Sequence, residues 1–170
     1  MILEAHPDAT FIYNELYDQT NTSKSLLKAL RASQESGVLW LNGDVVFDHR
    51  VLERVKDRIL NEKSFVCVNT SAVGEEEVKY TVDEKGNINS LSKKVENALG
   101  EAVGINFISK FHKTSTINHL IECADNDYFE RGLELAIEND RIEIEPVDIS
   151  DLFAVEVDFQ ADLDRANSAI

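Results

Sequence analysis

The sequence has few of the residues that mark disulfide-rich, zinc-binding or fibrous proteins. Its 170 residues include 2 cysteines, 2 prolines and 7 glycines. Cys67 and Cys123 lie far apart and lack the paired spacing of zinc ligands, and two cysteines are too few for a disulfide framework. Apolar residues make up 43% of the chain. This composition excludes a disordered or collagen-like protein and favours a globular domain with a substantial core.

Long apolar runs are also absent. No stretch approaches the roughly 18–20 apolar residues that a membrane helix needs. The first residues lack the basic head and apolar run of a signal peptide. We therefore expect a soluble, cytoplasmic protein without a membrane partner.

Basic residues are scarce. The chain has 17 Lys and Arg against 32 Asp and Glu, which gives a formal charge of −15. This charge argues against nucleic acid and anionic membranes as the main partners, because both would be repelled. A small anionic ligand stays possible where a cation or a local basic group offsets the repulsion.

Apolar strand-like runs alternate with helix-like segments along the whole chain. This order predicts an α/β fold: a Rossmann-like, mostly parallel sheet with helices on both faces, in one domain over 1–170. A hairpin at 78–82 and 88–91 has one solvated face and interrupts the alternation. The expected strands are 9–14, 38–41, 64–68, 102–108, 142–147 and 154–157, and the expected helices begin near 22, 50, 115, 128 and 160.

Polar residues follow three of the expected strands, where ligands of parallel sheets bind. Asn14 follows the first strand and Asp44 the buried run 38–41, while Glu156 and Asp158 share one face at the end of the last strand. Carboxylate oxygens are the ligands that Mg²⁺ prefers. Alternatively, Asp44 is a turn residue, and Glu156 and Asp158 form an exposed strand end with Asp158 capping the next helix.

Lys93 and Lys94 form a basic doublet in an acidic chain. The doublet could contact a phosphate, or it could be a solvated strand end. An aromatic box for a quaternary ammonium could use aromatic residues that are equally suited to packing, namely Tyr17, Tyr80, Tyr128 and Phe129.

Several segments resemble the sugar-phosphate and phosphocholine nucleotidyltransferases. The run 38–47, Val-Leu-Trp-Leu-Asn-Gly-Asp-Val-Val-Phe, resembles their metal-binding segment, and 156–163, Glu-Val-Asp-Phe-Gln-Ala-Asp-Leu, their closing acidic motif. Residues 13–26 resemble the Asn-x-x-Tyr … Thr-Asn … Ser-Leu segment of the phosphocholine cytidylyltransferase-like branch. The hairpin and the segment 103–105 follow in family order, so the resemblance covers nearly the whole chain.

The resemblance implies a nucleotidyl transfer from a nucleoside triphosphate, with CTP favoured, to a phosphorylated alcohol or sugar phosphate. It implies that Asp44 and Asp158 hold Mg²⁺ with Glu156 beside it. It implies that Lys93 meets substrate phosphate as a catalytic residue. Within 13–26, it implies that Asn14, Tyr17 and Asn21 bind substrate.

One departure from the family pattern concerns its glycine-rich nucleotide loop, of the type Leu-Ala-Ala-Gly-x-Gly-x-Arg. No segment of this kind occurs here. We therefore expect a domain that is incomplete at its N-terminus, with impaired activity as an isolated chain and an exposed sheet edge that favours a homo-oligomer. Two alternatives stay open: a non-catalytic α/β module that binds metal or ligand, and a glycosyltransferase-like domain, although the Asp-x-Asp of the latter is absent at Asp44.

Overall fold

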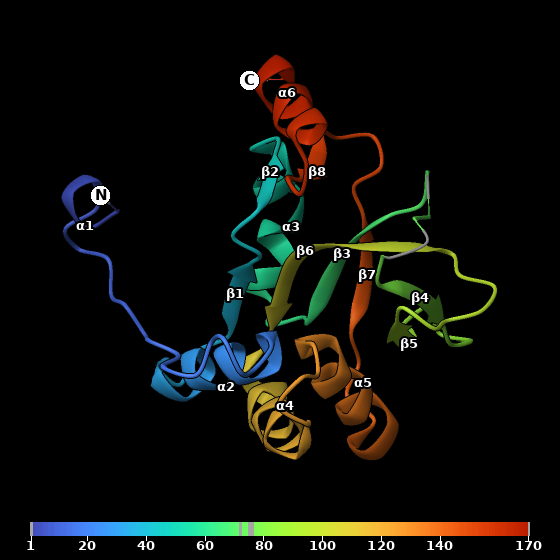
Figure 1. The fold of residues 1–170 in the computed structure, drawn as a ribbon. Coiled ribbons are helices and arrows are strands. Elements are labelled where there is room, and N and C mark those ends of the chain that lie inside the picture. The colour runs from blue at the N-terminus through green and yellow to red at the C-terminus, as the bar shows by residue number, and fades with distance from the viewer. Residues whose placement is uncertain (1, 72, 75–76, 170) are drawn as a thin grey trace.

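Helices cover both faces of a mixed sheet in the computed structural model, which describes residues 2–71, 73–74 and 77–169 (Figure 1). The main sheet has the strand order β5-β4-β6-β3-β7, and β1 also pairs with β6. Its strands are β1 (Val38–Leu41), β3 (Phe65–Asn69), β4 (Lys79–Val82), β5 (Ile88–Ser92), β6 (Gly100–Ile108) and β7 (Glu145–Asp148). A second sheet pairs β2 (Val45–Phe47) with β8 (Ala154–Glu156).

Strand direction follows from the pairing partners. β3 and β7 pair in parallel, whereas β1, β3 and β4 each pair with β6 in antiparallel fashion. β1, β3 and β7 therefore run in one direction, and β6 runs against them. The predicted α/β class is confirmed.

Alternating side chains of β3 separate the core into two layers. Val66 and Val68 face one cluster, which includes buried residues of α2 (Thr22–Ala32), α4 (Lys110–Glu122) and α5 (Phe129–Asp140). Phe65 and Cys67 face the other, which includes buried residues of α3 (Arg50–Leu60). The uninterrupted apolar run of β3 is thus explained by burial on both faces, and the prediction of helices on both faces is confirmed.

β6 connects the parts of the sheet because it pairs with β4 along its first half and with β1 along its second. Between the two halves, Gly104 has a φ of +65°. A Cβ atom there would lie 2.8 Å from the Asn42 side-chain nitrogen. Glycine is therefore required both by the backbone conformation and by the close approach of Asn42.

The predicted strand at 9–14 is wrong. These residues form an extended arm with no strand pairing, which leads from α1 (Ile2–Ala5) toward α2 and stands apart from the sheet in Figure 1. The arm exposes Phe11, Ile12 and Tyr13. A strand needs a neighbour to satisfy its backbone hydrogen bonds, and within the described residues the arm has none.

Three expectations about the other strands and helices need correction. β1 was expected to be covered on both faces, yet it is half-buried and Leu41 is 42% exposed, because its pairing within the described residues is with β6 alone. β7 begins at Glu145 rather than at Ile142, and Pro146 lies inside it at the edge of the sheet. α4 begins at Lys110, earlier than predicted, since Ser109 caps it by accepting a hydrogen bond from the backbone of His112.

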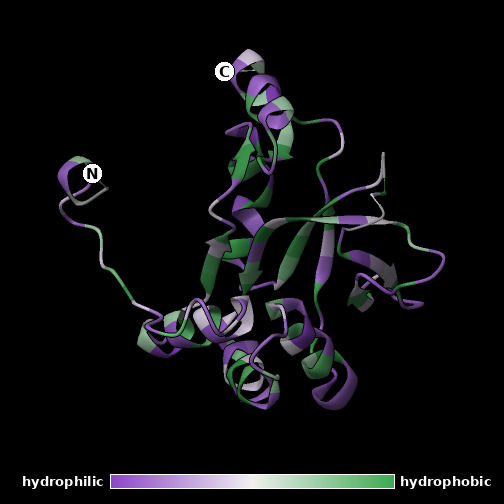
Figure 2. Cartoon of the chain, viewed as in Figure 1, coloured by the Kyte–Doolittle hydropathy of each residue, from purple (hydrophilic) through white to green (hydrophobic). Residues whose placement is uncertain are grey.

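The last helix, α6 (Gln160–Ala169), follows β8 as expected. Within the main sheet, β1 and β3 are largely hydrophobic, whereas β7 is mostly hydrophilic (Figure 2). Within the described part of the chain, no helix has the length and apolar character that crossing a membrane requires.

Candidate functional site

The pairing of β2 with β8 brings two distant acidic segments to one edge of the molecule. Val45 pairs with Glu156, and beyond this pair the backbone N–H of Val157 donates a 2.9 Å hydrogen bond to the carbonyl of Asp44. Asp44 and Asp158 therefore lie on neighbouring segments, although they are 114 positions apart in the sequence. The structure thus brings together the backbone segments that carry Asp44, Glu156 and Asp158, and the role of these residues in metal binding stays a prediction.

Glu156 has an unusual electrostatic environment at this edge. Burial raises the pKa of its carboxyl to about 7, and the negative charges of Glu77, Asp44 and Asp158 contribute in the same direction. A hydrogen bond with the Asn42 side chain has the opposite effect. The pKa of Glu156 thus reports both partial burial and an excess of nearby negative charge.

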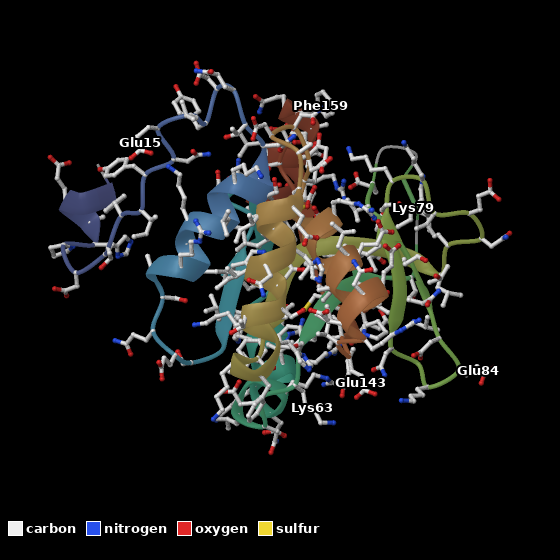
Figure 3. The ribbon with its side chains drawn as sticks, turned by 90° about the horizontal axis from the view of Figure 1, so that it is seen from below. Glu15, Lys63, Lys79, Glu84, Glu143 and Phe159 are labelled. Carbon is white, nitrogen blue, oxygen red and sulfur yellow. The ribbon has the colours of Figure 1, made fainter. Side chains whose placement is uncertain are left out.

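Three adjoining cavities form a cleft beside this acidic edge. The first, of about 420 Å³, is lined by Glu156, Asp158 and the start of α6. A central cavity of about 100 Å³ shares Glu156 with the first and Lys93 with a third cavity of about 510 Å³. In Figure 3, Phe159 marks the first cavity and Lys79 marks strand β4 near Lys93.

Lys93 lies where the central and third cavities meet, so the structure places it in the cleft. Its Nζ lies over the ring of Tyr128, 5.0 Å from the ring centroid. Lys94 and Arg131 also line the third cavity. The cleft therefore has a negative end near Glu156 and a partly basic end near Lys93.

Glu130 is the main cleft residue that the sequence analysis missed. It lies in the first turn of α5, is only 8% exposed, and lines the central and third cavities. Burial raises the pKa of its carboxyl to about 7. Glu130 is three and seven positions before the buried Leu133 and Ile137, so it lies on the apolar face of the helix. A charged residue on an apolar helix face is the feature of the sequence that could have revealed it.

The predicted substrate residues Asn14 and Asn21 make structural hydrogen bonds. The side-chain nitrogen of Asn14 donates to the hydroxyl oxygens of Thr20 and Ser25, each at 3.0 Å. The side-chain oxygen of Asn21 accepts a 2.7 Å hydrogen bond from the Thr22 backbone as the N-cap of α2. Neither residue lines the three cavities, and their roles in substrate binding stay predictions.

Tyr17, the third of these residues, is 78% exposed and lies outside the three cavities. The other three members of the possible aromatic box differ from one another in burial and location. Tyr80 and Phe129 are each 4% exposed and pack in the core, whereas Tyr128 is 47% exposed and lines the cleft. Of these four residues, Tyr128 alone faces the cleft.

The acidic residues fit a hard divalent cation through the chemistry of their donors. Carboxylate oxygens are available at Asp44 and Asp158, and the pKa of Glu156 is raised first by burial and then by nearby negative charges, which a cation would offset. Among the described residues, no three His, Cys, Asp or Glu side chains are grouped closely enough to hold a metal by themselves. Mg²⁺ needs fewer protein ligands, because water and substrate phosphates complete its coordination.

Comparison with solved structures places the chain in a known fold. The inositol-1-phosphate CTP transferase from T. maritima superimposes with a TM-score of 0.72 at 14% identity over 92% of this chain. The CTP:phosphocholine cytidylyltransferase from Streptococcus pneumoniae gives 0.70 at 12% identity over 98% of the chain. The chain has the nucleotidyltransferase fold.

The match to solved nucleotidyltransferases is one of structure rather than sequence. A UDP-glucose pyrophosphorylase also has this fold, with a TM-score of 0.67 at 11% identity. The chain spans 64% of the length of the T. maritima transferase and 61% of the length of the pyrophosphorylase. No protein-family model and no curated protein matches the sequence.

Proposed function

We propose that this chain is a nucleotidyltransferase domain that binds a nucleoside triphosphate with Mg²⁺ and a phosphorylated alcohol or sugar phosphate. CTP is the favoured nucleotide, because the resemblance of residues 13–26 is to the cytidylyltransferase-like branch. The observation that carries the proposal is the pairing of β2 with β8, which sets Asp44 beside the segment of Glu156 and Asp158, and these two residues line the cleft. The fold of the solved neighbours supports it.

In the proposed reaction, a phosphate oxygen of the acceptor forms a bond to the α-phosphorus of the nucleotide. The bond between the α-phosphorus and the bridging oxygen of the β-phosphate breaks, and pyrophosphate leaves. A divalent cation at the acidic edge supplies charge neutralisation for the triphosphate. Asp44 and Asp158 would hold this cation. Lys93, which lies where the central and third cavities meet, would orient the acceptor phosphate.

This assignment reconciles a charge of −15 with an anionic substrate. The acidic edge attracts cations, so the nucleotide binds as its metal complex rather than as a free anion. The basic end of the cleft, with Lys93, Lys94 and Arg131, is left for the acceptor phosphate. The two substrates are thus expected at opposite ends of the cleft.

A non-catalytic binding module is the second candidate. The observation that favours it is that no three His, Cys, Asp or Glu side chains among the described residues are grouped closely enough to hold a metal ion. A domain of this kind would bind metal nucleotide or acceptor without turnover, unless another segment or chain supplied a glycine-rich loop. Release of pyrophosphate from CTP and an acceptor, measured with the chain alone, separates the two candidates.

Calorimetric titration with MgCTP tests the metal and nucleotide site. We expect Asp44→Asn and Asp158→Asn each to weaken MgCTP binding by about tenfold or more. Asp57→Asn is the matched control, because Asp57 is an exposed carboxylate on α3 outside the cleft. Undiminished binding by Asp44→Asn, or binding of CTP that persists after all divalent cations are chelated, would contradict the proposal.

A further inference from the structure

Glu130 carries a carboxylate oxygen that has no hydrogen-bond partner among the described residues. The side chain is 8% exposed, and its Oε2 atom is buried without a hydrogen bond in the described part of the chain. The backbone of Glu130 itself offsets part of the negative charge. A buried acceptor that lacks a donor is costly and rare in folded proteins, so its presence calls for an explanation.

Packing does not require a glutamate at this position. Glu130 lies on the same face of α5 as Leu133 and Ile137, where an apolar side chain of similar length would fill the space. The first turn of a helix favours a carboxylate, but an exposed position in that turn would serve equally well. Neither the core nor the helix dipole therefore accounts for a buried, half-satisfied carboxyl.

The surroundings of Glu130 point to a ligand. The central cavity of about 100 Å³ is lined by Glu130 together with Asn42, Lys93, Tyr128 and Glu156. The Lys93 ammonium lies over the Tyr128 ring beside this cavity. The cavity thus combines two buried or half-buried carboxylates, which accept hydrogen bonds, with one cation that can meet a phosphate.

We propose that Glu130 is a ligand-binding residue that accepts a hydrogen bond from an N–H or O–H group of the phosphorylated acceptor inside the central cavity. This inference rests on the proposed function in one respect: the ligand is taken to carry the acceptor phosphate that Lys93 would contact. The acceptor class is then a small phosphate ester that carries a hydroxyl or a primary ammonium close to its phosphate. A quaternary ammonium has no N–H to donate, so it would leave Oε2 without a partner.

Phosphoethanolamine and phosphocholine test this point because they differ only in three methyl groups that replace the N–H donors. Calorimetry without nucleotide measures their affinities, and glycerol 3-phosphate serves as the probe with hydroxyl donors. We expect phosphoethanolamine or glycerol 3-phosphate to bind about tenfold more tightly than phosphocholine. A preference for phosphoethanolamine identifies an ammonium donor, and a preference for glycerol 3-phosphate identifies a hydroxyl.

The variant Glu130→Gln should remove most of this preference. We expect it to weaken the binding of the preferred probe about tenfold and to change the binding of phosphocholine little. Glu53→Gln is the matched control, because it makes the same change at an exposed first-turn glutamate of α3 that lines none of the three cavities. Circular dichroism verifies folding. If Glu130→Gln does not fold, the same titrations are made with Glu130→Met, whose side chain suits the apolar face of α5.

Three results would overturn the inference: no binding of any probe, phosphocholine bound as tightly as both other probes, or an unchanged preference in Glu130→Gln. The last result would mean that a water molecule satisfies Oε2. Asp44→Asn separates this inference from the proposed function. If probe binding depends on Glu130 while MgCTP binding does not depend on Asp44, the cleft binds the acceptor and the proposed nucleotide site is wrong.

Discussion

The buried carboxyl of Glu130 should make the stability of the protein depend on pH in a way that one substitution removes. Its pKa is raised from an ordinary 4.5 to about 7, and burial is the largest cause, followed by the opposing effect of its own backbone and the charge of Glu156. A difference of this size corresponds to roughly 3 kcal/mol, at about 1.36 kcal/mol for each tenfold change in proton affinity.

The sign follows from proton binding. Between about pH 4.5 and pH 7 the folded protein holds a proton on Glu130 that the unfolded chain has released, so the free energy of unfolding falls as the pH rises. The stabilisation is fully present below the unfolded pKa and is lost as the pH passes through the folded pKa of about 7. The glutamine in Glu130→Gln cannot titrate, so the variant does not show this fall in the free energy of unfolding.

Urea unfolding at about pH 4.5 and about pH 8 provides the measurement. The difference in stability between Glu130→Gln and the original protein should grow by roughly 3 kcal/mol, in favour of the variant, from the lower to the higher pH. Glu138→Gln should show no such growth, because Glu138 is exposed. If the two pH profiles of Glu130→Gln and the original protein stay parallel, the reasoning about the buried carboxyl is refuted.

Two further predictions concern residues that hold the local backbone structure. Asn21→Ala should lower the free energy of unfolding by about 1 kcal/mol, measured in urea, because it removes the N-cap of α2, whereas Asn21→Ser should keep most of it. Gly104→Ala should destabilise by about 1–3 kcal/mol, seen as a lower Tm, because alanine must adopt a φ of +65° and displace the Asn42 side chain. An unchanged stability in either alanine variant would contradict the cap or the close contact, respectively.

Much of the fold could be predicted from the sequence because several segments carry unambiguous patterns. The apolar run 65–68 has no polar face, so it required cover on both sides, which α3 and α5 provide. The start of α3 was predicted at its observed position near residue 50, because its apolar residues recur at helical spacing. In such segments local preference and tertiary packing favour the same structure.

The arm at 9–14 shows where local pattern fails. Its β-branched and aromatic residues favour a strand, but strand formation depends on a pairing partner that composition does not reveal. The same limitation applies to β1, whose apolar sequence suited a central strand and whose observed pairing leaves Leu41 exposed. Partner identity is a property of topology, and the isolated segment does not encode it.

The candidate site also has one part that could be predicted from the sequence and one part that could not. Asp44 and Asp158 could be linked through family order, and the β2–β8 pairing shows how two strand ends bring them together. Glu130 was missed because it looks like an ordinary first-turn acid, and its significance depends on burial and on the central cavity, which form only in the folded chain. Position in the sequence therefore located the acidic edge but not the far wall of the cleft.

The two carboxyls with pKa values of about 7 are best understood together. Glu156 and Glu130 line the same central cavity, and the negative charge of Glu156 adds to the burial that raises the pKa of Glu130. A core selected for stability alone would replace at least one of them by an apolar side chain, because repulsion and burial both oppose folding near neutral pH. Retaining both is expected where ligands supply the missing partners: a cation beside Glu156 and a hydrogen-bond donor beside Glu130. On this reasoning, binding of either ligand should favour binding of the other, since each removes part of the shared repulsion.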